Sequence, residues 1–374
     1  MNLEKITEYL DKVDTLGVPG ADCIIYKNHE LVYRHMVGTS DKDYKKPIDG
    51  SELYLMFSMT KVQTMVAFMQ LVEEGKISLE DEVGKYLPAY GHLTVEKDGK
   101  VIPAKKPLLV KYLLSMQSGL DYELGRPGIL RVLKEKGDKA TTRELVDAFV
   151  ESPLIFEPGT HFRYSLSHDV AAAIIEVVSG MSFGEYLKKN IWEPLGMKNT
   201  RFAKPMNDEE PRLAQQFIVD ENGKTVTMEQ ACCYQLSESY ESGGAGLISC
   251  TQDYAVFADA IACGGVGRNG ARILNPETIE LMKNNLLSDT GRQDLVDTMG
   301  RVGYGYGCGV SVFLEPEKVN SIAPKGVFGW DGAAGACITM DTVSGISIVY
   351  IQHVRNCGIS YNEIHPTLRD LTFG

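Results

Sequence analysis

The sequence predicts a mixed α/β (α+β) fold, in which strands from both ends of the chain form one sheet and a mostly helical segment lies between them. Strand-like alternation occurs near the N-terminus and in the last hundred residues, whereas apolar residues at helical spacing dominate the middle. The chain has 374 residues, 44% of them hydrophobic, which is enough for a sizeable core. We expect a discontinuous sheet domain over 1–80 and 240–374, and a mostly helical domain over 81–239.

The first elements are a helix and a strand pair. Residues 1–10 form an amphipathic pattern through Leu3, Ile6 and Leu10. Residues 20–36 then contain two β-rich runs separated by the turn Lys27-Asn28-His29-Glu30, which predicts a hairpin.

Helical spacing and capping signals dominate the middle of the chain. Glycines end two of the predicted helices, and capping boxes open two others. The predicted helices are 58–74 before Gly75, 108–115, the one capped by Thr141–Glu144 that runs to about Val150, 167–179 before Gly180, the one capped by Ser182–Glu185, and the one that Asn275-Pro276 opens.

The last hundred residues change to strand-like patterns. Gly303–Phe313 alternates glycine with aromatic and β-branched residues. The runs Val327–Trp330, Ala336–Met340 and Ile346–Gln352 are separated by Gly/Asp turns, so consecutive strands are expected.

The charge balance is acidic. Lys and Arg number 38 against 50 Asp and Glu, a net charge of −12, which argues against a nucleic-acid partner.

No apolar run reaches about 18 residues, so no membrane-spanning helix is expected. The N-terminus has neither the cationic start nor the apolar stretch of a signal peptide, and we expect a cytoplasmic protein. The oligomeric state is not predicted.

The cysteines are eight, an even number that would allow four disulfides. None forms a CxxC pair, and no histidine stands at zinc-finger spacing from them. In a long chain without an export signal, reduced and mostly buried thiols are the favoured interpretation, and a metal site is not expected.

Ser58-Met59-Thr60-Lys61 is the sharpest chemical feature. A serine hydroxyl needs a base to become a nucleophile, and a lysine three residues later lies on the same helix face. A helix N-terminus favours developing negative charge, and burial would push the lysine toward neutrality. About one SxxK is expected by chance in such a chain, so a capping serine beside a solvated lysine is the alternative.

Tyr164-Ser165-Leu166 follows the Pro158-Gly159 loop and precedes a helix. A phenol held near Lys61 could ionise partly and act as base for Ser58. The alternative is a half-buried tyrosine whose hydroxyl caps the backbone. Two similar tyrosines, Tyr26 and Tyr240, lack the preceding Pro-Gly loop.

Gly329–Gly335, a glycine-rich segment at a predicted strand edge, is the third element. Its glycines would let a substrate approach the backbone closely. The Ala333 amide could form an oxyanion hole with the amide of Ser58. The alternative is a glycine-rich turn anchored by Trp330.

In order along nearly the whole chain, these features resemble the serine β-lactamase and penicillin-binding-protein superfamily. The resemblance is closest to its class C-like branch, which includes serine esterases. The similar segments are the SxxK box Ser58–Lys61, Leu113–Leu120 ("LLTHTSGL", with Met116 where His is usual), Glu157–Ser165 ("PGxxxxYS"), Leu195–Thr200 ("LGMxxT"), Gly243–Ser249 ("GGLxST", with one extra residue) and Gly329–Gly335 at the KTG-type box.

Two departures from the branch bear on the substrate. β-Lactamases and peptidases of this branch usually carry Tyr-x-Asn, where this chain has Leu166, and Lys or His followed by Thr-Gly, where it has Trp330-Asp331-Gly332. Esterase-type relatives resemble this chain in both features. The cation that would bind a substrate carboxylate is therefore missing, and we expect Asp331 to repel an anionic ligand.

The resemblance implies a β-lactamase/transpeptidase-like fold, an antiparallel sheet flanked by helices plus a mostly helical domain. It implies a serine hydrolase that cleaves carboxylic esters through a Ser58 acyl-enzyme, with Lys61 and Tyr164 as general base and acid and the amides of Ser58 and Ala333 as oxyanion hole. Trp330, Asp331, Gly332 and Tyr122 are the expected substrate-binding residues.

The expected partner is a small ester or amide substrate, and no metal or organic cofactor is required. The loops around 120–135 and 205–240 are expected to set acyl-chain length. Two alternatives stay open: a β-lactamase or D-amino-acid peptidase, and a non-catalytic ligand-binding member of the fold.

Overall fold

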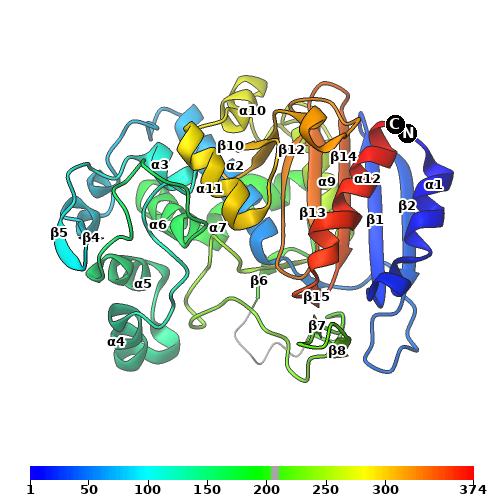
Figure 1. Cartoon of the computed structure of the whole chain (residues 1–374), viewed down its shortest axis with the longest axis horizontal. Helices are drawn as coiled ribbons and strands as arrows, with labels where there is room; N and C mark the ends of the chain where they lie inside the picture. The colour runs from blue at the N-terminus through cyan, green and yellow to red at the C-terminus, as the bar shows by residue number, and fades with distance from the viewer. Residues whose placement is uncertain (204–209) are drawn as a thin grey trace.

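The computed structural model describes residues 1–203 and 210–374, and its largest element is a seven-stranded antiparallel sheet (Figure 1). The strand order is β10-β11-β12-β13-β14-β1-β2. The strands are β1 (Gly20–Lys27), β2 (Glu30–Gly38), β10 (Tyr304–Tyr306), β11 (Ser311–Phe313), β12 (Phe328–Asp331), β13 (Cys337–Asp341) and β14 (Ile346–Gln352). β1 pairs with β14, so the two ends of the chain build one sheet, as predicted.

Helices cover both faces of the sheet. Successive residues of β1 point to opposite faces, so Ile25 and Ile24 belong to different apolar clusters. Ile25 packs with residues of α1 (Leu3–Leu10) and α12 (His365–Phe373), which lie side by side on one face in Figure 1. Ile24 belongs to the large cluster that includes α9 (Thr251–Ala262), on the other face.

The helical region centres on α2 (Thr60–Glu73) and α6 (Ser167–Ser179), which pack against each other. Most residues of α2 are buried, including Lys61, so this helix runs through the core rather than along the surface. The predicted capping boxes and the Gly180 stop are present. The other α-helices are α3 (Val110–Leu114), α4 (Pro127–Lys136), α5 (Thr142–Ala148), α7 (Phe183–Leu187), α8 (Glu193–Leu195), α10 (Pro276–Lys283) and α11 (Asp289–Met299).

The short strands outside the seven-stranded sheet, of two to four residues each, were not predicted, because so few residues do not establish a periodicity. They form small sheets that join distant parts of the chain. These are β3 (Tyr54–Leu55), β9 (Leu247–Ser249) and β6 (Arg201–Phe202), then β15 (Val354–Arg355), β7 (Phe217–Val219) and β8 (Thr225–Thr227), and the hairpin of β4 (Thr94–Lys97) and β5 (Lys100–Pro103). The division into domains at residues 80 and 240 stays a prediction.

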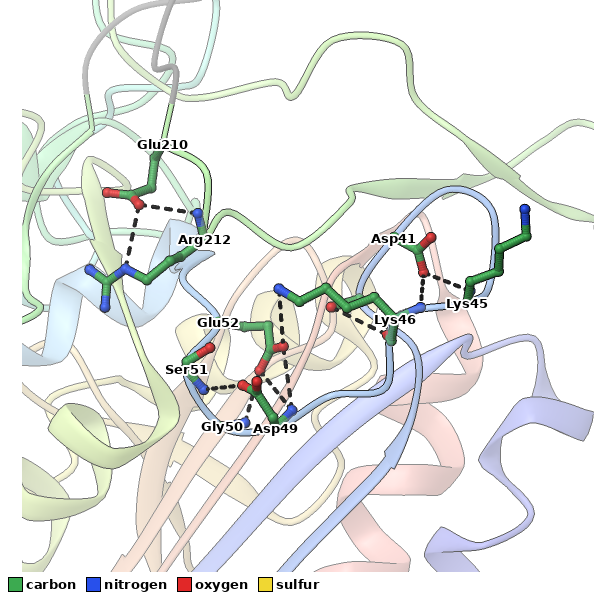
Figure 2. A network of polar contacts seen from close by, with 10 residues as sticks. Asp41, Lys45, Lys46, Asp49, Gly50, Ser51, Glu52, Glu210 and Arg212 are labelled. Atoms are coloured by element: carbon green, nitrogen blue, oxygen red, sulfur yellow. Dashed lines mark hydrogen bonds and ion pairs between the residues drawn. The ribbon is translucent and has the colours of Figure 1, made fainter.

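The loop between β2 and β3 is held by a polar network around Glu52 (Figure 2). The Glu52 carboxylate is buried and accepts hydrogen bonds from the backbone N–H of Asp49 and, at 2.9 Å, of Gly50. The Lys46 ammonium lies 3.8 Å from the same carboxylate. This Glu52 network thus compensates a buried charge with backbone amides and a cation.

No disulfide is assigned in the described structure, and five of the eight cysteines are buried, in agreement with the expectation of reduced, mostly buried thiols. Over the described ranges, no single helix is long and apolar enough to cross a membrane. The bent pair Ser167–Ser179 and Phe183–Leu195 satisfies the criterion by length and composition only.

Candidate active site

Ser58 lies in a short 3₁₀ turn, Phe57–Met59, that leads directly into α2. The turn is fixed from both sides, since the Met56 N–H donates to Leu247 O at 2.8 Å and the Met59 N–H to Met56 O at 3.1 Å. Phe57 has a left-handed backbone, φ 46°, which is unusual for a residue with a side chain. Such strain persists only where the surroundings enforce it, and here it precedes the candidate nucleophile.

Lys61 projects from the first turn of α2 into the interior, and it is fully buried. Its Nζ lies 3.2 Å from Ser58 Oγ, as the SxxK spacing predicts. It also donates to Tyr122 OH at 2.8 Å and to Gly244 O at 2.7 Å. All three partners are neutral. Because the Lys61 side chain is fully buried, the alternative of a solvated lysine is wrong.

Burial dominates the protonation of Lys61. Desolvation lowers its pKa from 10.5 to about 7, against the opposing effect of the Asp169 charge. Asp169 is itself buried and accepts hydrogen bonds from Tyr240 OH at 2.7 Å and Ser242 Oγ at 2.6 Å. A lysine with this pKa is partly neutral at pH 7 and can accept the Ser58 proton.

Tyr164 lies beside the same pair of residues. Lys61 Nζ is 4.6 Å from the centroid of its ring, and Trp330 Nε1–H donates to its hydroxyl oxygen at 2.9 Å. Burial raises the Tyr164 pKa, although hydrogen bonds with Ser58 and Trp330 act in the opposite direction. The structure therefore brings Ser58, Lys61 and Tyr164 together, but it favours a neutral phenol over the partly ionised one that we expected.

Tyr122, which we expected to bind substrate, contacts Lys61 directly. Its hydroxyl accepts a hydrogen bond from Lys61, and its ring packs against those of Tyr164 (centroids 5.6 Å apart) and Tyr234 (5.9 Å). Together with Trp330, which packs on Tyr164 at 5.4 Å, these rings form an aromatic wall around the lysine.

The turn after β12 lies against the segment that carries Ser58. A Cβ atom on Gly332 would lie only 2.5 Å from Met56 O, so only glycine fits this approach. The next residue, Ala333, is exposed, and its N–H donates to no acceptor within the described part of the chain. This arrangement suits the predicted oxyanion role of the Ala333 amide.

The expectation that Asp331 repels an anionic ligand needs correction. Its carboxylate forms an ion pair with the guanidinium of Arg301, and both side chains are largely buried. The guanidinium carbon also lies 5.4 Å from the centroid of the Trp330 ring. The pair is neutral overall, so Asp331 adds no uncompensated negative charge to this edge of the site.

Sequence reasoning missed Asp169, included Gly244 in the Gly243–Ser249 segment without giving it a role, and set Tyr240 aside. The Gly244 N–H lies 3.4 Å from Asp169 Oδ1, while its carbonyl accepts from Lys61. The available signal was an aspartate in the first turn of an otherwise apolar helix, where the helix dipole stabilises a buried carboxylate.

Of the two loops expected to set acyl-chain length, the first contains α4, over 127–136. Part of the second, residues 204–209, lies outside the described residues.

Comparison with known proteins identifies the family of this chain. The β-lactamase family model matches residues 5–356. Protein Rv1367c of Mycobacterium tuberculosis is 27% identical over 365 residues, covering 94% of this chain and 90% of that protein. Esterase EstB of Burkholderia gladioli is 26% identical over 380 residues, covering 95% and 90%.

Among solved structures, EstCE1, described as a hydrolase with promiscuous acyltransferase activity, has a TM-score of 0.80 and 24% identity. The match covers 100% of this chain and 98% of that one, and shows the same fold. The ordered motifs, the fold and the family match together show that this chain belongs to the β-lactamase family, within the serine β-lactamase and penicillin-binding-protein superfamily, which has esterase-like members.

Proposed function

We propose that the protein is a serine esterase that cleaves carboxylic esters through an acyl-enzyme on Ser58. The observation that carries the proposal is Lys61 Nζ, fully buried, 3.2 Å from Ser58 Oγ, with its pKa lowered to about 7. An ordinary surface lysine would stay protonated and could not serve as a base at neutral pH.

In the first step, Ser58 Oγ attacks the ester carbonyl while its proton moves to neutral Lys61. The C–O bond to the leaving alcohol then breaks, and the alcohol takes a proton from Lys61 through the Tyr164 hydroxyl. The oxyanion that forms between these events accepts hydrogen bonds from the amides of Ser58 and Ala333. Water attacks the acyl-enzyme in the second half, with the same groups exchanging the proton in the same way.

The surroundings of Ser58 favour an uncharged ester. Tyr122, Tyr164 and Trp330 present aromatic surface next to the nucleophile. Arg301 lies beside Trp330, at the position of the family's Lys or His, and its charge is already paired with Asp331. A β-lactam or peptide carboxylate would have to compete with that pair, which disfavours the β-lactamase and peptidase alternative. The relative named as an esterase, EstB, supports the same choice.

The test is the intact mass of the protein after brief exposure to p-nitrophenyl butyrate, with Ser58→Ala alongside. We expect a butyryl adduct on the wild type that is absent from the variant, and nitrophenol released in catalytic excess. Nitrocefin should be turned over far more slowly than the ester.

Nitrocefin turnover that exceeds ester turnover would favour the β-lactamase alternative. Stoichiometric binding without adduct or turnover would contradict the esterase and favour a ligand-binding protein.

A further inference from the structure

A second cluster of chemically competent side chains lies on elements that carry none of the catalytic residues. His29 stands in the turn between β1 and β2, while Asp259 and Cys263 lie one helical turn apart at the C-terminal end of α9. One ligand-type atom from each of the three lies within 4.8 Å of the others. Their separation in sequence explains why cysteine and histidine spacing gave no sign of the cluster.

We propose that His29, Asp259 and Cys263 bind a zinc ion, with a fourth position open to water. Imidazole, carboxylate and thiolate are the ligands that zinc takes in proteins, usually with tetrahedral geometry. One thiolate and one carboxylate balance the charge of Zn²⁺, and His29 remains neutral. Binding releases the Cys263 thiol proton and leaves the Nδ1 lone pair of His29 on the metal.

The distances suit this change. His29 Nδ1 is 2.7 Å from Asp259 Oδ2, and Cys263 Sγ is 3.6 Å from Asp259 Oδ1. Tetrahedral zinc with bonds of about 2.0–2.3 Å places its ligand atoms roughly 3.3–3.8 Å apart. For both residues to bind one ion, the separation of His29 Nδ1 from Asp259 Oδ2 must widen by about 1 Å, while all three ligand atoms already lie within 4.8 Å of one another.

The three residues stand on well-fixed backbone. The Asn28 N–H donates to Gly345 O at 2.9 Å, and the His29 N–H to Asp259 Oδ1 at 3.0 Å. His29 also has a left-handed backbone, φ 69°, so the turn that presents its ring is specifically shaped. Such prior positioning lowers the conformational cost of binding an ion.

Of the three proposed ligands, the carboxylate is buried, whereas the imidazole and the thiol are partly exposed. Asp259 is buried with a side-chain exposure of 3%, and its ion pair in the described chain is with His29, which is 32% exposed. Cys263 is also partly exposed. The carboxylate thus lies at the base of the site, while the imidazole and the thiol lie where an ion and a water molecule can reach them.

The chain offers a matched control. His35 and Asp11 also form a His–Asp pair at 2.7 Å, but within the described structure no cysteine sulfur completes a three-ligand group with them, although Cys23 is the strand partner of His35. If zinc requires all three ligands, His35→Gln should leave binding unchanged, whereas Cys263→Ser and His29→Gln should weaken it at least about 10-fold. Both latter residues are partly exposed, so their variants are expected to fold.

The experiment uses the tag-free full-length chain, treated with a chelator and then titrated with Zn²⁺ by calorimetry and with Co²⁺ by absorption. We expect one ion per chain, a thiolate-to-cobalt charge-transfer band that Cys263→Ser abolishes, and a zinc-dependent rise in Tm that the same variant lacks. Ester hydrolysis should be the same in wild type and Cys263→Ser.

Three results would each overturn the proposal. The first is a wild-type chain with neither saturable zinc binding nor a cobalt band. The second is Cys263→Ser with wild-type affinity, and the third is an equal loss in His35→Gln. The cluster would then be a hydrogen-bonded anchor between the hairpin turn and α9.

Discussion

The Lys61 centre and the Glu52 network are both buried charged sites, and they differ in what surrounds the charge. Glu52 accepts from two backbone amides and faces the Lys46 ammonium. Lys61 contacts two hydroxyls and a carbonyl, all neutral. Burial without a contacting counter-charge shifts the pKa of Lys61, whereas the Glu52 network has the compensation that a structural anchor needs. Charge burial alone therefore does not identify a catalytic group.

The largest expected effect follows from removing the uncompensated charge. Lys61→Met should lower kcat/KM for p-nitrophenyl butyrate by at least about 10³-fold, because Ser58 loses its base. The measurement is steady-state kinetics at a temperature well below Tm. Lys46→Met is the matched control and should keep wild-type activity. A Lys61→Met enzyme with more than a tenth of wild-type activity would remove Lys61 from the mechanism.

The opposite pattern is expected at the Glu52 network. Glu52→Ala leaves the N–H groups of Asp49 and Gly50 without their acceptor, so the free energy of unfolding should fall by about 2–3 kcal/mol. Denaturant unfolding measures this, and kcat/KM should stay at the wild-type value. Ser51→Ala, at an exposed neighbouring position, should change stability by less than about 0.5 kcal/mol. A loss of activity without a loss of stability in Glu52→Ala would contradict the structural role that we assign to the Glu52 network.

A smaller effect is expected from Trp330→Phe, which keeps an aromatic ring but deletes the hydrogen bond to Tyr164 OH. Loss of that one bond should reduce kcat about 10-fold, with little change in KM. The other tryptophan is a control, since Trp192 Nε1 donates to buried Gln63 at 2.7 Å. Trp192→Phe should lower Tm and leave kcat unchanged. Equal kcat values for both variants would show that the Trp330 bond has no part in proton transfer.

The smallest effect is a displacement of the pH profile. Lys61 accepts a proton only when neutral, so kcat/KM should rise with pH and level off above a pKa of about 7. The Asp169 charge raises the pKa of Lys61, hence Asp169→Asn should move this limb to lower pH. Glu52→Gln should leave the limb in place. A limb that Asp169→Asn moves to higher pH would contradict the assignment of the titrating group to Lys61.

The sequence predicted the elements with strong periodicity or capping, such as α6 with its Gly180 stop and the hairpin of β1 and β2. The sequence also predicted that Ser58, Lys61 and Tyr164 lie together, because the SxxK spacing places Ser58 and Lys61 about one turn apart where the 3₁₀ turn leads into α2. It could not predict the ion pair of Arg301 with Asp331, or Asp169 behind Gly244, since both depend on tertiary contacts between segments far apart in the chain. The neutral state of Tyr164 depends on burial, which sequence alone does not quantify.

The pairing of β1 with β14 has a consequence for biosynthesis. β1 is made first, yet its partner along one edge is made more than three hundred residues later. Until β14 is made, the edge of β1 that faces away from β2 has no strand partner, and a strand of another chain can pair with it. The turn that carries Ala333 arrives equally late. The nascent chain thus carries Ser58 and Lys61 long before it can hold an oxyanion, and chaperones that cover strand edges should bind it during that interval.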